Sequence, residues 1–192
     1  MVEREYDKDT SWDITNGLPS IVTQGLTLSI LGYPYVMPDM IGENEYSNKA
    51  DKELFIRWAE INSFMPVMQY SIPPWRFDEE AIEICRGFTE LHQKLGIYSK
   101  ALECKETGVP IMRPLFFQYP EDINTYGLKD EFMIGTDLLV VPITKKGERK
   151  KDVYLPKGTW VDHFSNEIFK GGRVIEDYPA PLDRLPIFWQ DK

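Results

Sequence analysis

Cysteine, histidine and long apolar runs are all scarce in this sequence. Its 192 residues include two cysteines and two histidines. His92 and His163 stand apart from any group with metal-ligand spacing, so we predict neither a metal site nor a cofactor. No run of about 18 apolar residues occurs, and we expect no membrane-spanning segment in this chain. The absence of a Gly-x-Ser-x-Gly motif and of a glycine-rich phosphate loop argues against serine hydrolases and nucleotide-binding enzymes.

Basic residues are also in the minority. The 22 lysines and arginines stand against 31 aspartates and glutamates, which gives a net charge of −9. Binding to nucleic acid requires clustered basic side chains that displace counterions. The main basic run, residues 145–151, lies between strand-like stretches and is typical of a solvated turn. We therefore expect no nucleic-acid partner, and a neutral or cationic small molecule fits this charge better.

The two cysteines are predicted to be free. Cys85 and Cys104 lie 19 residues apart on what reads as one helical segment, and a continuous helix would separate them by roughly 28 Å. A disulfide cannot span that distance. We therefore expect two buried thiols.

The first 105 residues alternate between helical and strand-like patterns. Residues 18–31 are apolar around most of a helix, and Gly32 supplies the expected stop. The short apolar run 34–37 reads as an interior strand that ends just before Asp39. This order of helix, strand and acid is typical of β/α units that present polar residues at one end.

The same alternation continues beyond the first strand. Residues 51–64 carry apolar side chains at a helical spacing, which predicts an amphipathic helix. Residues 67–71 read as the next strand, and Asp78 is the expected N-cap of a long helix that runs through Leu95. Consecutive β/α units, and hence an α/β fold, are indicated.

Near residues 107–108 the pattern changes to short apolar runs separated by glycine, proline and charge. Such runs predict antiparallel strands. They occupy residues 111–119, 138–143, 151–155 and 185–189. We therefore predict two domains, with β/α units over residues 1–105 and an antiparallel β-sandwich-like domain over residues 106–192.

Two aspartates stand at positions that β/α units use for chemistry. Asp7 precedes the first predicted helix, and Asp39 follows the first predicted strand. Cleavage of a glycosidic bond requires one carboxylic acid to protonate the leaving oxygen and one carboxylate to attack or to activate water. The pair therefore suggests a carbohydrate-cleaving enzyme. The alternatives are that Asp7 caps the helix that follows and that Asp39 accepts hydrogen bonds from loop amides.

Several motifs, found in the same order, resemble glycoside hydrolase family 31. In the first domain they are Asp7 with Trp12, the run Gly-Tyr-Pro-Tyr-Val-Met-Pro-Asp-Met-Ile-Gly at residues 32–42, and Arg57-Trp58 before Phe64-Met65-Pro66. In the second they are residues 108–117, 132–135, 138–142, 153–160 and 181–186. The resemblance covers nearly the whole chain. It implies the C-terminal portion of a (β/α)8 TIM barrel followed by the family's β-domain.

Within the family, residues 7–12, 31–34 and 64–75 resemble the myogenesis-regulating glycosidase branch. This likeness implies cleavage of α-galactosides. The family's α-glucosidases instead carry Gly-Asp-Asn at the acid/base loop and Phe at the position of Glu43. They also carry Arg and His at the positions of Gln69 and Ser71. α-Glucosidase or α-xylosidase activity is the alternative within the family, and a non-catalytic carbohydrate- or protein-binding module is the alternative outside enzymes.

The resemblance also implies roles for individual residues. Asp7 corresponds to the general acid/base, and Asp39 corresponds to an acid that orients sugar hydroxyls. Arg4 either reaches the sugar or steers the charge of Asp7. Gln69 and Ser71 either bind the sugar or form a satisfied polar pair at the barrel rim.

The family's nucleophile has no counterpart in this sequence. It belongs to a Trp-x-Asp-Met motif on an earlier strand, and no such motif occurs here. We therefore expect a fragment of a retaining α-glycosidase that is inactive alone. Its expected partners are a glycoside or oligosaccharide substrate and the missing N-terminal part of the same barrel.

Overall fold

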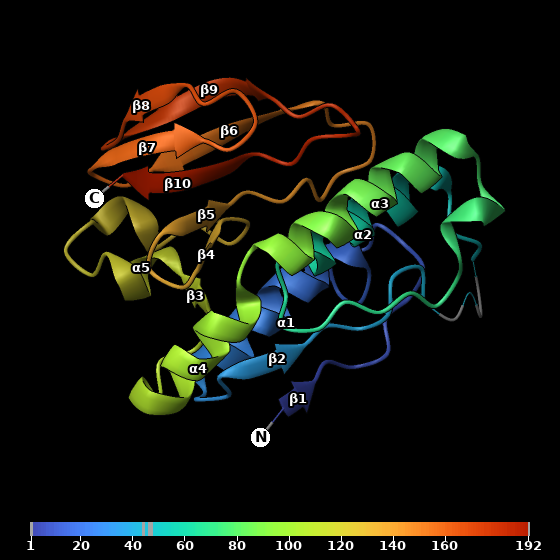
Figure 1. Ribbon diagram of the computed structural model, residues 1–192, viewed down its shortest axis with the longest axis horizontal. Coiled ribbons are helices and arrows are strands. Elements are labelled where there is room, and N and C mark those ends of the chain that lie inside the picture. The colour runs from blue at the N-terminus through green and yellow to red at the C-terminus, as the bar shows by residue number, and fades with distance from the viewer. Residues whose placement is uncertain (1, 44, 46–47, 192) are drawn as a thin grey trace.

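The computed structural model describes residues 2–43, 45 and 48–191, with helices and parallel strands first and antiparallel strands after them (Figure 1). We call the residues up to 105 the barrel region and those from 106 the β region. The elements of the barrel region are β1 (Val2–Arg4), α1 (Leu18–Ile30), β2 (Tyr35–Met37), α2 (Lys52–Asn62), a 3₁₀ turn (Pro74–Arg76), α3 (Glu79–Lys94) and α4 (Ile97–Thr107), which ends just beyond it. Those of the β region are β3 (Met112–Pro114), α5 (Leu115–Gln118), a second 3₁₀ turn (Ile123–Thr125), β4 (Phe132–Ile134), β5 (Leu138–Val140), β6 (Lys150–Leu155), β7 (Thr159–Asp162), β8 (Ile168–Lys170), β9 (Arg173–Pro179) and β10 (Ile187–Asp191).

Three predicted helices are confirmed, and their ends have the expected chemistry. Asp51 accepts a hydrogen bond from the backbone N–H of Leu54 at 2.8 Å at the start of α2. Asp78 does the same for Ala81 at 3.0 Å at the start of α3. Gly32 follows α1 with φ of +94°, a conformation that glycine adopts without the strain of a Cβ atom.

The helix predicted after Asp78 is confirmed up to Leu95, but the single helical segment expected to carry both cysteines is wrong. Gly96 adopts φ of +66°, and this left-handed residue separates α3 from α4. Cys85 and Cys104 therefore lie on different helices, and both are buried and free. Among the helices of the described residues, none has both the length and the apolar character needed to cross a membrane.

Parallel pairing brings the first strands of the barrel region side by side. β1, which the sequence pattern did not predict, pairs in parallel with β2, and Arg4 lies opposite Met37. The strand predicted over residues 67–71 is wrong as a regular strand, because only an isolated parallel bridge between Ile41 and Tyr70 forms there. The arrangement is consistent with β/α units.

The strands of the β region form two antiparallel sheets. One sheet has six strands in the order β3-β4-β5-β10-β7-β8, and the other consists of β6 and β9. On β4, Phe132 and Ile134 join an apolar core shared with the helices, whereas Met133 joins a second core with β6 and β9. Because side chains alternate along a strand, helices cover one face of the larger sheet and the smaller sheet covers the other. The sandwich-like prediction agrees with this layering.

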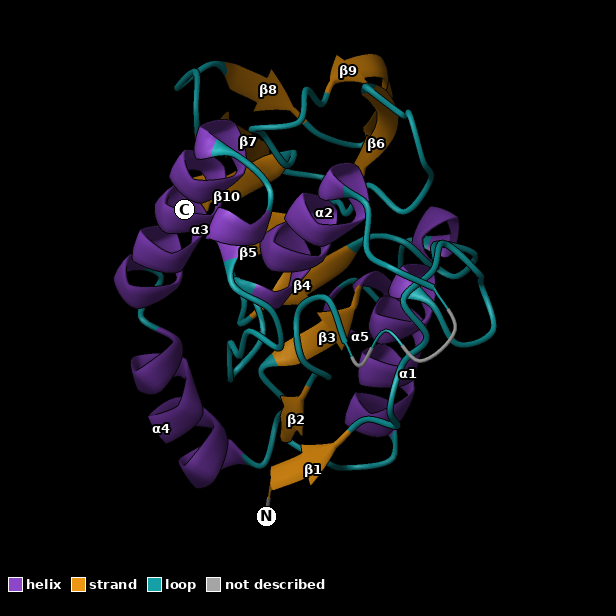
Figure 2. Cartoon of the chain, turned by 90° about the vertical axis from the view of Figure 1, so that its right-hand side faces the viewer, coloured by secondary structure: helices purple, strands orange, loops and turns teal. Residues whose placement is uncertain are grey.

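The two regions share one interior. Figure 2 shows the strands stacked in a column, with α1 on one side and α3 and α4 on the other. The larger apolar core contains residues from both regions, including Trp58 of α2 and Phe132 of β4. Gly108, with φ of +73°, follows the end of α4. The predicted boundary between residues 105 and 106 stays a prediction.

Candidate active site

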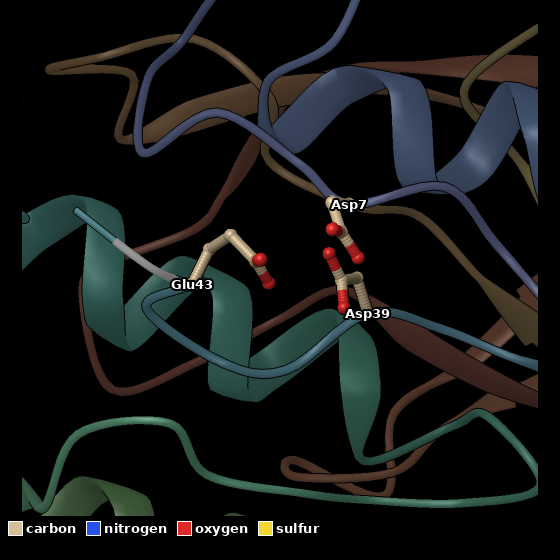
Figure 3. Close-up of side chains that lie close together, drawn as sticks. All are labelled: Asp7, Asp39 and Glu43. Atoms are coloured by element: carbon tan, nitrogen blue, oxygen red, sulfur yellow. The ribbon is translucent and has the colours of Figure 1, made fainter. Parts of the chain in front are cut away.

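Three carboxylates meet beyond the ends of the two parallel strands. Asp7 follows β1, Asp39 follows β2, and Glu43 lies further along the same loop as Asp39. One carboxylate oxygen of each residue lies within 4.8 Å of the others, and Figure 3 shows the three carboxyl groups close together. Parallel strands end at the same edge of a sheet, which explains why residues 32 positions apart become neighbours.

Arg4, the last residue of β1, connects an exposed acid with a buried one. Its Nη1 donates to Asp7 Oδ1 at 2.7 Å, and its Nη2 donates to Asp39 Oδ1. The side chain of Asp7 is 65% exposed, whereas that of Asp39 is 0% exposed. The hydrogen bond to Asp7 is the largest cause that raises the pKa of Arg4, and the charge of Asp39 adds to it. Arg4 is therefore placed to steer the charge of Asp7, and its contact with a sugar stays a prediction.

Asp39 holds together several segments around the site. Its Oδ2 accepts from the backbone N–H of Lys8 at 2.6 Å, and its Oδ1 accepts from that of Met40 at 2.9 Å. Its backbone carbonyl accepts from Asn62 Nδ2 at 2.9 Å, which ties the loop to the end of α2. The alternative role as an acceptor for loop amides is thus present in the structure. Sugar binding by Asp39 stays a prediction.

The side chain of Lys8 anchors the Asp7 loop below the site. Lys8 Nζ forms an ion pair with Glu5 Oε2 at 3.1 Å, and both side chains are fully buried. The same ammonium donates to Gln24 Oε1 on α1. Burial raises the pKa of Glu5 to about 8, while the positive charge of Lys8 acts in the opposite direction. Lys8, the residue next to Asp7, is therefore held by its backbone N–H, which donates to Asp39, and by its side chain, which contacts Glu5 and Gln24.

Of the remaining predicted site residues, Ser71 reaches the edge of the site and Gln69 is exposed. Ser71 Oγ donates to the backbone carbonyl of Glu43 at 2.8 Å. The carbonyl of Gln69 accepts from the N–H of Ile41 at 2.8 Å, and its side chain lies on the surface. The structure thus brings Arg4, Asp7 and Asp39 into direct contact and joins Ser71 to them through Glu43. Sugar binding by Gln69 and Ser71 stays a prediction.

Glu43 also belongs to this site. From the sequence it was noticed only because the family's α-glucosidases carry Phe at this position. Its side chain is 1% exposed, and it forms a hydrogen bond with Asp39. An acid four positions after Asp39 in the same loop was the available signal. This signal alone does not place Glu43 in the site, because the pairing of β1 with β2 is what brings Asp7 close to it.

The three carboxylates are close enough for a cation to bridge them. The guanidinium of Arg4 already bonds to two of them, Asp7 and Asp39, and supplies positive charge there. The prediction of no metal and no cofactor stays a prediction.

Two family models match this chain in succession. Residues 6–99 match the glycosyl hydrolases family 31 TIM-barrel domain, and residues 108–191 match the glycosyl hydrolase family 31 C-terminal domain. The chain is 38% identical to the myogenesis-regulating glycosidase of Mus musculus, with 96% of this chain and 28% of that protein covered. It is 37% identical to the SITS-binding protein of Tetronarce californica, over 100% of this chain and 28% of that protein. The chain thus spans 28% of the length of these curated relatives.

Solved structures agree with the sequence relatives. A family 31 sulfoquinovosidase from E. rectale, in complex with an aza-sugar inhibitor, superposes with a TM-score of 0.87 and 28% identity over 98% of this chain and 30% of that chain. A cycloalternan-degrading enzyme from Trueperella pyogenes, in complex with a covalent intermediate, gives a TM-score of 0.88 and 27% identity over 98% of this chain and 28% of that chain. The fold, the order of the two matched domains and the relatives agree with the motifs read from the sequence. The chain belongs to glycoside hydrolase family 31.

Proposed function

We propose that this chain supplies the acid/base side of an α-glycosidase active site that hydrolyses terminal O-glycosidic bonds. The observation that carries the proposal is the exposed carboxylate of Asp7, which Arg4 Nη1 holds at 2.7 Å beyond the end of a parallel strand. A general acid must reach the departing oxygen while its orientation is fixed. Asp7 is accessible and held, whereas Asp39 and Glu43 are buried.

The proposed mechanism retains the configuration at the anomeric carbon. Asp7 donates a proton to the glycosidic oxygen while a second carboxylate attacks the anomeric carbon and forms a covalent sugar intermediate. Asp7, now ionised, takes a proton from water, and the resulting attack on the intermediate releases the sugar. In such enzymes the two carboxyl groups are about 5–5.5 Å apart.

Asp39 is poorly placed to be the nucleophile. Its carboxylate is 0% exposed, and it accepts hydrogen bonds from Arg4, Lys8 and Met40. A nucleophile needs a free lone pair directed at the substrate. We therefore place the nucleophile in a part of the full-length protein outside this chain, and we propose that the isolated chain is inactive.

The surface beside β1 supports the presence of further barrel units in the full-length protein. In the described residues β1 has a single strand partner, β2. At the end of α1, Ile30 and Leu31 are 54% and 69% exposed. A β/α barrel closes only when each strand has two neighbours and its helices cover the apolar faces. Additional units of the same barrel would pair with β1 and cover this part of α1.

An α-galactoside is the substrate that we favour. The chain is similar to the myogenesis-regulating glycosidase, and Glu43 and Ser71 depart from the α-glucosidase pattern. Relatives named α-glucosidase 2, from Bacillus thermoamyloliquefaciens, and α-xylosidase, from Saccharolobus solfataricus, are 33% and 34% identical. These substrates are the alternatives. The similarity to a protein named for binding, the SITS-binding protein, favours a non-catalytic binding module as a second candidate.

The test is hydrolysis of aryl α-galactoside, α-glucoside and α-xyloside by the full-length protein. We expect the α-galactoside to be hydrolysed fastest, and we expect Asp7→Asn to lower kcat by about 10²- to 10⁴-fold, because the variant cannot transfer a proton. Asp9→Asn, a change at an exposed acid in the same loop, is the matched control and should keep the activity. The loss should be greatest for leaving groups that need protonation.

Three outcomes would count against this proposal. Turnover by the isolated 192-residue chain would show that no outside nucleophile is required. Full activity of Asp7→Asn would remove the acid/base role. A folded full-length protein that binds the glycosides without cleaving them would favour the binding module.

A further inference from the structure

Glu43 has a backbone that is fixed from several directions. It adopts φ of +48°, an uncommon conformation for a residue other than glycine. Ser71 Oγ donates to its carbonyl at 2.8 Å, and its N–H donates to the carbonyl of Met40 at 3.2 Å. Thr10 Oγ1 donates to the preceding carbonyl, that of Gly42, at 3.1 Å. Unusual backbone conformations persist where the surroundings enforce them, and they are common at functional sites.

The side chain of Glu43 is directed at the acids of the site rather than at solvent. Figure 3 shows its carboxyl group turned toward Asp7 and Asp39, and oxygens of the three groups lie within 4.8 Å of one another. After burial, hydrogen bonding with Asp39 is the largest cause that raises the pKa of Glu43. A hydrogen bond between two carboxyl groups requires a proton on one of them, because two ionised carboxylates would repel each other.

The proton belongs to Glu43. Asp39 accepts hydrogen bonds from Arg4, Lys8 and Met40, and donors of this kind stabilise an ionised carboxylate. Burial raises the pKa of Glu43 to about 8, and the hydrogen bond to Asp39 and the charges of Asp39 and Asp7 act in the same direction. The charge of Arg4 acts in the opposite direction. These surroundings favour the protonated form of Glu43 at neutral pH, and a protonated carboxyl group can donate a hydrogen bond to Asp39.

We propose that Glu43 is a positioning residue for the glycosidase reaction, because its carboxylic acid fixes Asp39, which in turn holds Arg4 and the loop that carries Asp7. This inference rests on the proposed function. The chain of contacts runs from Glu43 to Asp39, from Asp39 to Arg4 and to the Lys8 amide, and from Arg4 to Asp7. Above about pH 8 Glu43 becomes an anion beside two other carboxylates, and the arrangement loses its donor.

The test compares two substitutions at Glu43 in the full-length protein. In Glu43→Gln the amide N–H₂ replaces the carboxylic O–H as donor to Asp39, and it does not titrate. For the wild type we expect kcat to fall near pH 8. We expect Glu43→Gln to keep kcat within about threefold of the wild type at neutral pH and not to show this fall. Glu43→Ala removes the donor, and misplacement of Asp7 should lower kcat by about 10- to 100-fold with KM changed less than about threefold.

The controls separate positioning from general damage to the fold. Glu83→Gln changes an exposed acid on α3 and should leave both kcat and the pH profile unchanged. Equal losses in Glu43→Gln and Glu43→Ala would overturn the inference, as would an unchanged alkaline limb in Glu43→Gln. If the wild type is active, Asp7→Asn is inactive and neither Glu43 variant differs from the wild type, only this inference fails. If the full-length wild type cleaves no glycoside, the proposed function fails and this inference fails with it.

Discussion

The barrel region and the β region fill their interiors with different chemistry. In the β region, alternate side chains of the six-stranded sheet are apolar on both faces, and each face has a cover. The barrel region buries charged groups among its helices and loops, including the pairs Arg57–Glu60 and Lys8–Glu5. Apolar alternation is enough to specify a layered sheet. Buried charges need particular partners, so the barrel region depends on contacts that are distant in sequence.

The largest expected effect comes from separating the two regions. We predict that residues 1–105 alone do not form a cooperative unit, because they lose the apolar face of the β region and already expose apolar side chains at the end of α1. Residues 106–192 should keep a folded sheet, because the core between the two β sheets lies entirely within them. Thermal melts by circular dichroism, together with size-exclusion chromatography of each fragment, measure this.

The comparison of the regions would fail if the fragments behaved in the opposite way. A cooperative, monomeric melt of residues 1–105 would show that the barrel region specifies its own fold. An unfolded fragment 106–192 would show that the core beneath β6 and β9 is insufficient without the helices.

The next effect concerns the buried charge that joins the two regions. Arg57 of α2 is bonded to both carboxylate oxygens of Glu60 at 3.0 and 2.9 Å, and its Nη2 donates to the carbonyl of Ala180 at 2.7 Å. Arg57→Met should lower the free energy of unfolding by about 3–5 kcal/mol, because Glu60 would remain buried without its partner. Urea unfolding of this chain measures the loss.

Two further variants test the cause of that loss. The double substitution Arg57→Met with Glu60→Leu should recover much of the stability, since a buried ion pair replaced by apolar side chains is often close to neutral. Arg86→Met breaks the exposed pair with Glu83 and should change stability little. A loss in the double variant as large as that in Arg57→Met would show that the contact with the β region, rather than the unpaired acid, dominates.

The sequence predicted those parts of the fold whose signals are local. Asp78 was identified as a helix start because an N-cap acts within three residues of itself, and the helix after Asp51 was identified from its apolar spacing. The break between α3 and α4 was missed in the expectation of one helical segment from Cys85 to Cys104, because Gly96 lies between apolar residues that continue the helical pattern. The strand expected over residues 67–71 was wrong because strand formation depends on a partner, and only Tyr70 has one.

For the site, the sequence supplied residues but not their arrangement. Asp7 and Asp39 were identified from their places in the chain and from the family resemblance, and the structure brings them together through Arg4. Glu43 could not be placed beside Asp7, because parallel pairing of β1 and β2 sets that distance. Burial of the Lys8 side chain could not be predicted from the sequence either, since a lysine next to a loop acid normally remains in solvent.

The smallest expected effect tests one exception to the apolar interior of the β region, which also buries Arg113 and Asp162. Glu131 is 3% exposed, and its Oε1 accepts from the backbone N–H of Tyr154 at 2.9 Å. Burial raises its pKa to about 8 from 4.5, the hydrogen bond from Tyr154 and the charge of Lys151 oppose this, and the charge of Asp130 adds to it. Between these two pH values the unfolded chain has lost a proton that the folded chain keeps. The contribution of Glu131 to stability is therefore complete below pH 4.5 and is lost as pH rises through about 8.

Glu131→Gln makes this contribution independent of pH, because the amide resembles the neutral acid and can still accept from Tyr154. Relative to the wild type, the variant should gain stability from pH 5 to pH 8 by at most about 1.4 kcal/mol per pH unit, measured by urea unfolding. The exposed Glu121→Gln is the control and should follow the wild type at both pH values. If Glu131→Gln also follows the wild type, Glu131 is ionised in the folded protein. The β region would then bury an ionised acid in addition to the charge of Arg113, and the contrast between the two interiors would reduce to the number of charged groups.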